Sequence, residues 1–441
     1  MTSHPIGASV IANGFYVDKL MTSAPTIEDV IEIKQQVIEV LNKGGFPLRT
    51  IATNDASIIA DVTAVDREDI IQVEDVDYVK ELGLKWSPFL DNFLFSYTQP
   101  LVSSKVSKRI ILSNIARFFD PLGLLNPLMV TCKILLQQLW KFRLNWGESV
   151  PPSNYTQWES FCTKLPLVEN LRVTRLVACD YNSTTHAFVD ASTRAYGATI
   201  YVVSNSTSAL LCAKSYVAPT KEVSLFRLKL SAAVLLAELL EFVYKKIHHN
   251  TGNVQCWTES LIMLAWTKGD PSRWTTFVSN RVTKIQLLTH HYYWHHVPSE
   301  LNPAEILSRG TKADKFIDNS LWFHGPHFLT QDAQHWPPPS SNAINDNNIP
   351  EQRRHNIVLL TNPTTDIISE HKCVTNYNKL LRIMCYVRRF ADASRGIRTN
   401  QNSITASEIN HHFSPFVASS KVPNSLMNYP CFKRTASFIG S

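Results

Sequence analysis

The sequence has no close pair of cysteines, no long apolar run and no charged leader. Its eight cysteines are scattered singly along 441 residues, whereas a zinc knuckle or a redox motif needs two cysteines a few residues apart. This excludes such sites and favours a reduced, intracellular compartment, cytoplasmic or nuclear. No stretch reaches the roughly 18 apolar residues of a membrane-spanning helix, and the first residues carry no secretory signal. We therefore expect a soluble protein without a membrane partner.

The excess of positive charge is also small. Lys and Arg number 43 against 37 Asp and Glu, which gives a formal net charge of +6. Such a balance is compatible with a polyanion partner without indicating one. Hydrophobic residues make up 44% of the chain, as in a folded protein. The length exceeds that of one ordinary hydrophobic core, so two or three domains are expected.

In the first third of the chain, one helix is clearly marked. Apolar residues recur at helical spacing from Thr26 to Leu41, Thr26 is a suitable N-cap, and Gly44 and Gly45 follow as a stop signal. The other elements expected here are strands at Phe15–Val17, Ser57–Thr63 and Trp86–Tyr97, and two helices within Ser107–Trp140 around the breaks at Asp120-Pro121 and Asn126-Pro127.

A new unit is expected from about Leu176, in which strands and helices alternate. Its expected strands are His186–Asp190, Ala195–Val203, Val254–Trp257 and Tyr292–Val297. Its expected helices are Leu225–Lys246, Leu261–Thr267, Phe277–Leu288 and Pro303–Ser308. This order predicts a mixed α/β layer fold of the α+β kind. The composition becomes polar and rich in Pro and Asn after Trp336, which indicates a linker, and Asn378–Phe390 is an amphipathic, basic helix before a weakly patterned tail.

Three acidic residues stand at expected junctions of secondary structure. Asp190 ends a strand in HAFVDAS, Glu259 follows a strand in CWTES, and Glu305 opens a helix in NPAEILSRG. Nucleases of the two-metal type need several carboxylates that converge on hard divalent ions, which activate water and stabilise the leaving oxygen. A sheet can bring such separated residues to one point, so the three acids are a candidate metal site.

Each acid also has a structural explanation. Glu305 lies three residues after Asn302, with Pro303 between them at the first helical position, which is the spacing of a capping box. Glu259 stands at a helix start, where the helix dipole favours a negative charge. The residues alone leave both explanations open.

Several segments, in a constant order, resemble one known family. The segments FVDASTRAYGATIYV, RLKLSAAVLLAELL, CWTESLIMLAW, RWTTFVSNRVTKIQ and HHVPSELNPAEILSRG resemble the ribonuclease H region of BEL/Pao-type retrotransposon polyproteins. Upstream, NGFYVDKLMTSAPTIEDVIEIKQQVIEVLNKGGFPLR resembles the end of their reverse-transcriptase palm, and LGLKWSP, KRIILSNIARFFDPLGLLNP and LLQQLW resemble the connecting segment. Downstream, LWFHGPHFLTQDAQHWP and KLLRIMCYVRRF resemble the approach to the integrase.

The resemblance implies a fragment of a Pol polyprotein with five parts. These are a palm remnant at 1–65, a connection-like helical segment at 66–175, a ribonuclease H-like domain at 176–312, a linker at 313–350 and a pre-integrase remnant at 351–441. It also implies an enzyme that hydrolyses the RNA strand of RNA–DNA hybrids with Mg²⁺ or Mn²⁺, with Asp190, Glu259 and Glu305 as catalytic residues and metal ligands.

The chain departs from the family's pattern at two lysines. The pattern places a glutamate at position 229 and aspartates at 259 and 305, whereas this chain has Lys229, Glu259 and Glu305. The family's polymerase hairpin ends in two aspartates, but here Asp18 is followed by Lys19, and an ammonium group cannot bind a metal. Polymerase activity is therefore not expected. Two functions stay open for the ribonuclease H-like part: impaired metal-dependent hydrolysis, or an inactive remnant that at most binds nucleic acid, which Lys19 and Lys229 favour.

Other residues are candidates for nucleic-acid contact. Arg273, Asn280 and Arg281 are possible phosphate contacts, while the nearby Trp257 and Trp266 are expected in the core. The histidines around the late strand lack familiar ligand spacing and are expected to be packed or solvated; they are His290, His291, His295 and His296. The basic helix near the C-terminal end, which carries Arg382, Arg388 and Arg389, is read as a solvated face over an apolar seam.

Overall fold

The computed structural model describes residues 4–16, 19–48, 51–60, 78–81, 84–97, 105–177, 183–247, 253–338, 348–353, 377–396 and 404. The chain divides into two compact units, Met1–Arg354 and His355–Ser441. In the second unit the described part is essentially one helix, α13 (Tyr377–Ser394), which includes the basic helix expected at Asn378–Phe390. No helix in the described ranges is long and apolar enough to cross a membrane.

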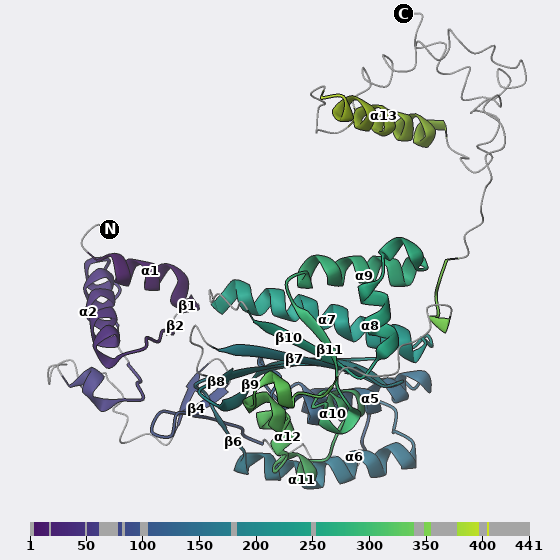
Figure 1. Ribbon diagram of the computed structural model, residues 1–441. Helices are drawn as coiled ribbons and strands as arrows, with labels where there is room; N and C mark the ends of the chain where they lie inside the picture. The colour runs from purple at the N-terminus through teal and green to yellow at the C-terminus, as the bar shows by residue number, and fades with distance from the viewer. Residues whose placement is uncertain are drawn as a thin grey trace, which may run out of the picture. The chain divides into compact units, whose positions relative to one another are not determined.

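A five-stranded mixed sheet forms the centre of the first unit (Figure 1). Strands β7 (Thr184–Ala191), β8 (Ala195–Ser204) and β9 (Thr207–Val217) form an antiparallel meander, and β10 (Val254–Thr258) and β11 (Tyr293–His296) run parallel to β7, in the order β11-β10-β7-β8-β9. Nearly every residue of β7, β8 and β10 is buried, because helices cover both faces. The mixed α/β fold with flanking helices is thereby confirmed, although β9 has no counterpart among the expected strands.

Helix α7 (Leu225–Ile247) covers one face of this sheet. Its residues Leu228, Ala232 and Leu236 pack at helical spacing against sheet residues such as Ile200 and Cys256. Helices α8 (Leu261–Lys268) and α9 (Thr276–Thr289) pack beside it through a second apolar cluster. Figure 1 shows these three helices on the same side of the sheet.

The opposite face is covered by helices that precede and follow the sheet in the chain. They are α5 (Asn126–Lys141), α10 (Glu305–Arg309), α11 (Ala313–Phe316) and α12 (Ser320–His324). One core joins Leu128 of α5 and Trp322 of α12 to Phe188 and Tyr201 of the sheet. Residues 313–336, which the sequence assigns to the start of a linker, are therefore short helices and turns held by buried aromatic side chains.

The segment that precedes the sheet, residues 105–177, contributes side chains to the same core. The amide of Ala213 in β9 donates to Leu122 O (2.8 Å), Asn126 Nδ2 donates to Ala213 O (3.0 Å), and Trp322 Nε1 donates to Leu124 O (2.9 Å). Helices α4 (Lys108–Ile115) and α6 (Pro152–Lys164) pack on the far side of α5. The boundary expected between 175 and 176 thus runs through a continuous hydrophobic core.

A smaller antiparallel sheet lies in the same connecting region. Its strands, in order, are β3 (Val79–Glu81), β4 (Leu84–Ser87), β5 (Asn92–Leu94) and β6 (Arg172–Thr174). The single strand expected at Trp86–Tyr97 is instead a hairpin, because the chain turns at Asp91, whose φ of 48° ends one strand and begins the next.

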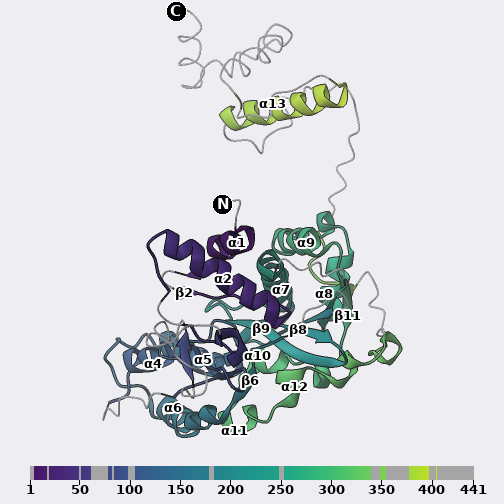
Figure 2. The same cartoon turned by 90° about the vertical axis from the view of Figure 1, so that its left-hand side faces the viewer.

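The N-terminal segment is a pair of helices and a short hairpin. Helices α1 (Pro5–Gly14) and α2 (Ile27–Lys43) lie against each other (Figure 2), and β1 (Phe15–Tyr16) pairs with β2 (Lys19–Leu20). Asp18 falls outside the described residues. The strand expected at Ser57–Thr63 is wrong where it is described, since Ala56–Ile59 is a 3₁₀ turn in which the Ser57 amide donates to the Asp55 side chain.

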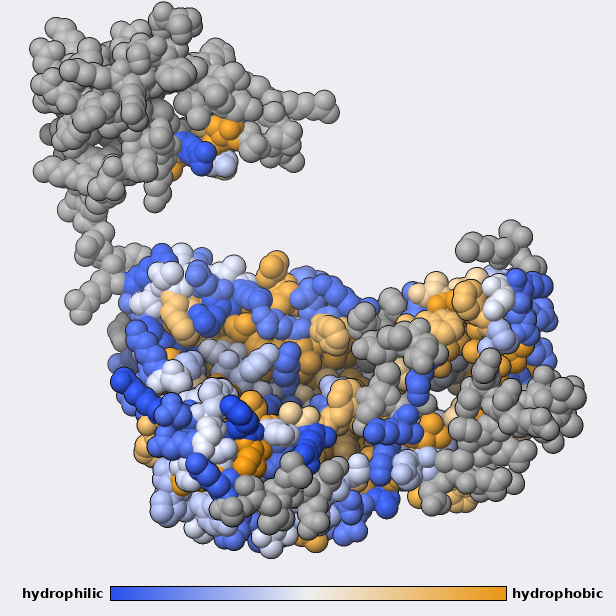
Figure 3. Space-filling view, turned by 180° about the vertical axis from the view of Figure 1, so that it is seen from behind, coloured by the Kyte–Doolittle hydropathy of each residue, from blue (hydrophilic) through white to orange (hydrophobic). Residues whose placement is uncertain are grey.

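Hydrophilic and apolar residues alternate over the surface of the first unit. Figure 3 shows one side on which apolar residues are seen in the hollow towards the middle and also at an edge, with hydrophilic residues between them. The polar residues of the candidate site lie where the parallel strands β7 and β10 end.

Candidate functional site

Asp190 lies near the end of the central strand β7. It pairs across the sheet with Gly197 of β8 and is only 3% exposed. Its Oδ2 accepts a hydrogen bond from Ser308 Oγ of α10, whereas Oδ1 is buried without a hydrogen-bond donor from the described part of the chain. Burial, together with the nearby charge of Glu259, raises the pKa of Asp190 to about 6.

Glu259 follows strand β10 directly and is held on both carboxylate oxygens. Lys229 Nζ of α7 donates to Oε1 in an ion pair, and Ser299 Oγ donates to Oε2. The side chains of Lys229 and Glu259 are 14% and 16% exposed. Burial raises the pKa of Glu259, but the hydrogen bonds from Lys229 and Ser299 outweigh it and leave this pKa below its usual value.

Glu305 begins helix α10 and faces away from the other two acids. Its Oε1 pairs with Arg309 Nη2 at 2.7 Å, one turn further along the same helix. The capping box considered for Glu305 is not formed: the Asn302 side chain instead accepts from Ala304 N and donates to Val189 O, both at 3.1 Å. Asn302 thereby ties α10 to the strand that carries Asp190.

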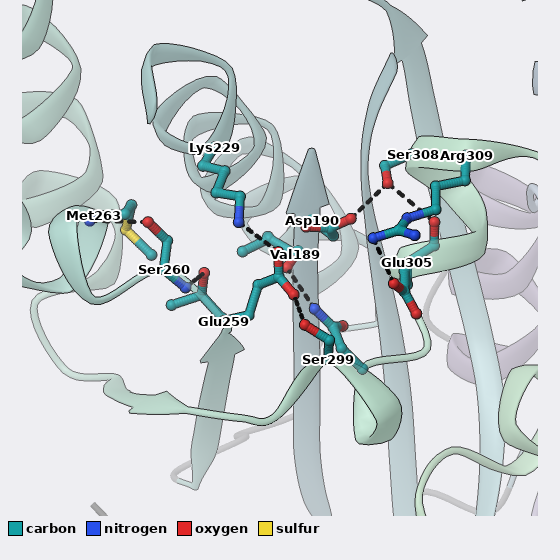
Figure 4. A network of polar contacts seen from close by, with 12 residues as sticks. Val189, Asp190, Lys229, Glu259, Ser260, Met263, Ser299, Glu305, Ser308 and Arg309 are labelled. Atoms are coloured by element: carbon teal, nitrogen blue, oxygen red, sulfur yellow. Dashed lines mark hydrogen bonds and ion pairs between the residues drawn. The ribbon is translucent and has the colours of Figure 1, made fainter. Parts of the chain in front are cut away.

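The structure brings Asp190, Glu259 and Lys229 together and leaves Glu305 at the margin. Figure 4 shows Lys229 reaching from α7 to Glu259, with Asp190 between this ion pair and Ser308, while Glu305 turns to Arg309. Within the described ranges, no three His, Cys, Asp or Glu side chains gather as a metal-binding group.

A divalent ion would find few open ligands in this arrangement. Hard cations need several oxygen ligands, but Glu259 has both oxygens engaged and Glu305 has one engaged by Arg309. Among the described residues of the site, Asp190 Oδ1 is the buried carboxylate oxygen without a hydrogen-bond donor. The Lys229 ammonium adds a positive charge next to Glu259. The residues as arranged therefore do not fit a two-metal centre.

The candidate nucleic-acid contacts lie on and before α9. The guanidinium carbon of Arg281 stands 3.5 Å from the centre of the Phe277 ring, and its Nη1 donates to Phe277 O. Arg273 lies over the ring of Trp274 at 5.0 Å, and Asn280 is exposed. Contact of these three residues with nucleic acid stays a prediction. Trp257 and Trp266 are fully buried, which confirms their place in the core.

Three residues of the acidic site were missed by the sequence analysis. Ser299, Ser308 and Arg309 hold the carboxylates, and the Ser308 to Asp190 contact joins residues 118 positions apart. Only the spacing of Glu305 and Arg309, one helical turn apart, is a signal that the sequence itself contains. Of the late histidines, His295 packs on Trp257, with ring centroids 4.7 Å apart, and hydrogen-bonds Gln255, whereas His290 and His291 are exposed.

One known family model matches a part of the chain. Residues 107–260 match the family model described as a Pao retrotransposon-like RNaseH-like domain. This match contains Asp190, Lys229 and Glu259, together with the helices α4, α5 and α6 that precede the large sheet. No curated protein matches the chain.

Among solved structures, the chain is similar to proteins of two kinds. A foamy viral protease-reverse transcriptase in complex with double-stranded DNA is 11% identical over 67% of this chain and 47% of its own, with a TM-score of 0.42. The RNase H1 of Halobacterium salinarum is 13% identical over 27% of this chain and 90% of its own (TM-score 0.22), and LC11-RNase H1 with an RNA/DNA hybrid is 16% identical over 31% and 99% (TM-score 0.24).

The chain thus spans less than half the length of the foamy viral protein. The motif resemblance and the matched family model overlap on the segment that builds strands β7 to β10 and helix α7. Residues 107–260 are thus similar to the Pao retrotransposon-like RNaseH-like domain, and this match supports a Pol fragment of Pao retrotransposon type.

Proposed function

We propose that the RNase H-like domain binds nucleic-acid duplexes of the RNA–DNA hybrid type without cleaving them. The family match supports the choice of ligand, and the exposed Arg194, which lies beside the acidic site, supplies positive charge at its edge. Polymerase activity is not part of the proposal, because Lys19 stands where the family's pattern has its second aspartate.

The Lys229–Glu259 ion pair carries this proposal. A metal that bound Glu259 would have to displace an ammonium group from a largely buried carboxylate and would then lie beside that same ammonium. Removing the partner of a buried charge is costly, since the charge that remains is left without compensation. The ion pair therefore opposes metal binding both by occupying the ligand and by repelling the ion.

A cleavage assay on a labelled RNA–DNA hybrid with Mg²⁺ or Mn²⁺ tests this proposal. The native chain is expected to bind the hybrid and leave it intact, and Lys229→Glu is expected to gain cleavage, because it restores a carboxylate and frees Glu259. Adding Asp190→Asn to Lys229→Glu should abolish the gain. Metal-dependent cleavage by the native chain that disappears in Asp190→Asn would refute the proposal.

Impaired hydrolysis is the second candidate function, and one observation favours it. Asp190 Oδ1 is buried and without a donor from the described residues, as expected of an oxygen that is reserved for a ligand. Mg²⁺ is often held by only one or two carboxylates together with substrate phosphates. In the same assay this candidate predicts slow cleavage that rises with Mn²⁺ concentration, whereas the inactive domain gives none.

A further inference from the structure

A short segment beyond the large sheet returns to its helices. Residues 348–353, here called the strap, place Ile349 in the apolar cluster of Trp266, Trp274 and Val278. Trp266 Nε1 donates to Pro350 O at 3.0 Å. The amide of Thr275 donates to Glu351 O and that of Arg353 to Arg273 O, both at 2.8 Å. The strap is therefore docked at the start of α9 by backbone as well as side-chain contacts.

The strap places the carboxylate of Glu351 against donors on α7 and at the start of α9. Arg227 Nε donates to Glu351 Oε1 at 2.7 Å, and Nη2 donates to Oε2 at 2.9 Å. Thr275 Oγ1 also donates to Oε2, at 2.5 Å. Two parallel bonds from a guanidinium fork are the geometry by which arginine binds either a carboxylate or a phosphate.

The surroundings of these donors are positively charged. Arg227 and Arg281 share the ring of Phe277, with their guanidinium carbons 4.8 and 3.5 Å from its centre. Thr275 is the N-cap of α9, where the helix dipole favours an anion. The Thr275 hydroxyl makes no cap hydrogen bond to its own helix and points to Glu351 instead. These groups together form an anion site in which Glu351 is the anion.

Glu351 adopts an unusual backbone conformation at this site. Its φ is 66°, in the left-handed region that residues other than glycine seldom occupy. The contacts of its carboxylate with Arg227 and Thr275 offset the cost of that conformation. A free anion would make the same contacts without the strained backbone.

We propose that Arg227, Thr275 and Arg281 form a binding site for a backbone phosphate of nucleic acid, and that Glu351 occupies it as an internal competitor. This inference rests on the proposed duplex binding, which supplies the phosphate. Arg227 lies two residues before Lys229 on α7, so the site and the acidic centre are about one helix diameter apart, on the order of 10 Å. That span corresponds to about three base steps at 3.4 Å each.

A titration of the full chain with a fluorescent RNA–DNA hybrid tests the competition. Glu351→Gln and Glu351→Ala are expected to bind the hybrid at least about threefold more tightly than the native chain, with a salt dependence steeper by about one unit. The gain should vanish when Arg227→Ala is added. Glu238→Gln is the matched control, since Glu238 is ion-paired to Lys284 between the same two helices and its removal changes the net charge equally.

The outcomes separate this inference from the proposed function. The phosphate site is overturned if the native, Glu351→Gln and Glu351→Ala proteins melt alike and bind the hybrid with equal affinity. It is also overturned if the gain in affinity persists when Arg227→Ala is added. If no variant binds the hybrid, the proposed function fails. The phosphate site is then tested separately by the ³¹P line broadening of inorganic phosphate. Broadening by Glu351→Gln that is lost with Arg227→Ala supports it, and no broadening overturns it.

Discussion

Lys229 and Glu259 form an ion pair that joins the beginning of helix α7 to the end of strand β10. Asp190 lies next to this pair, and the charge of Glu259 acts on it. Two carboxylates that share a site repel each other, so a neighbouring positive charge stabilises both. In this chain Lys229 supplies that charge. Glu305 is not part of this group, because it pairs with Arg309.

Loss of the ammonium group should destabilise the domain. Lys229→Met leaves Glu259 largely buried with only Ser299 as a partner, and such an uncompensated charge costs about 1–3 kcal/mol of unfolding free energy. The double variant Lys229→Met, Glu259→Gln should recover most of the loss, because it removes both charges. Urea unfolding of the three proteins measures the difference. A Lys229→Met protein as stable as the native one would show that the pair does not hold the site together.

The raised pKa of Asp190 gives a prediction about pH. Since burial raises this pKa from 3.8 to about 6 in the folded state, ionisation of Asp190 opposes folding as the pH rises through this range. Asp190→Asn should therefore be more stable than the native chain above pH 6, by about 1–3 kcal/mol, and the two should converge below pH 4. Thermal unfolding from pH 4 to 8 measures this. An advantage that is constant with pH would contradict the assignment.

Close approach of strand β8 to helix α10 sets the distance between Asp190 and Ser308. A Cβ atom added at Gly197 would lie 2.7 Å from Leu307 Cβ and 3.1 Å from Lys214 O. Gly197→Ala should push α10 outwards and cost about 1–3 kcal/mol, as overpacking does. Gly147→Ala is the control, because nothing lies within 4 Å of its added Cβ. Equal melting temperatures for the two variants would argue against this account.

Local patterns in the sequence were sufficient for the long helices. Thr26 caps α2 as expected, its Oγ1 accepting from Asp29 N at 3.1 Å, and the helix expected at Leu225–Lys246 is α7 almost to the residue. Both have a clear apolar periodicity, and α2 has a capping residue as well. The sequence did not predict strand β9, because buried and exposed residues do not alternate regularly along it. One of its backbone hydrogen bonds also goes to Leu122, which is far away in the chain.

The sequence named two acids that the structure brings together, Asp190 and Glu259, but it did not predict their contacts or the separate position of Glu305. Motif order pointed to Asp190, Glu259 and Glu305 and marked Lys229 as a departure from the family's pattern. Whether Lys229 faces Glu259 or solvent depends on the packing of α7 against the sheet, which no local pattern determines. The hydroxyls of Ser299 and Ser308, and the carboxylate of Glu351 on Arg227, join residues between 40 and 124 positions apart.

The shared core predicts that the sheet cannot fold without the connecting helices. A fragment of residues 176–353 lacks Leu124, Leu125, Leu128 and Leu171, all of which are buried with the sheet residues Phe188 and Tyr201. At about 1.5–3 kcal/mol for each buried side chain, their loss amounts to roughly 6–12 kcal/mol, which is comparable with the whole stability of an ordinary domain. We expect the fragment of residues 105–353 to unfold cooperatively, and the fragment of residues 176–353 to bind a hydrophobic dye and show no cooperative transition. Cooperative unfolding of the shorter fragment at a similar temperature would instead restore a domain boundary at 175.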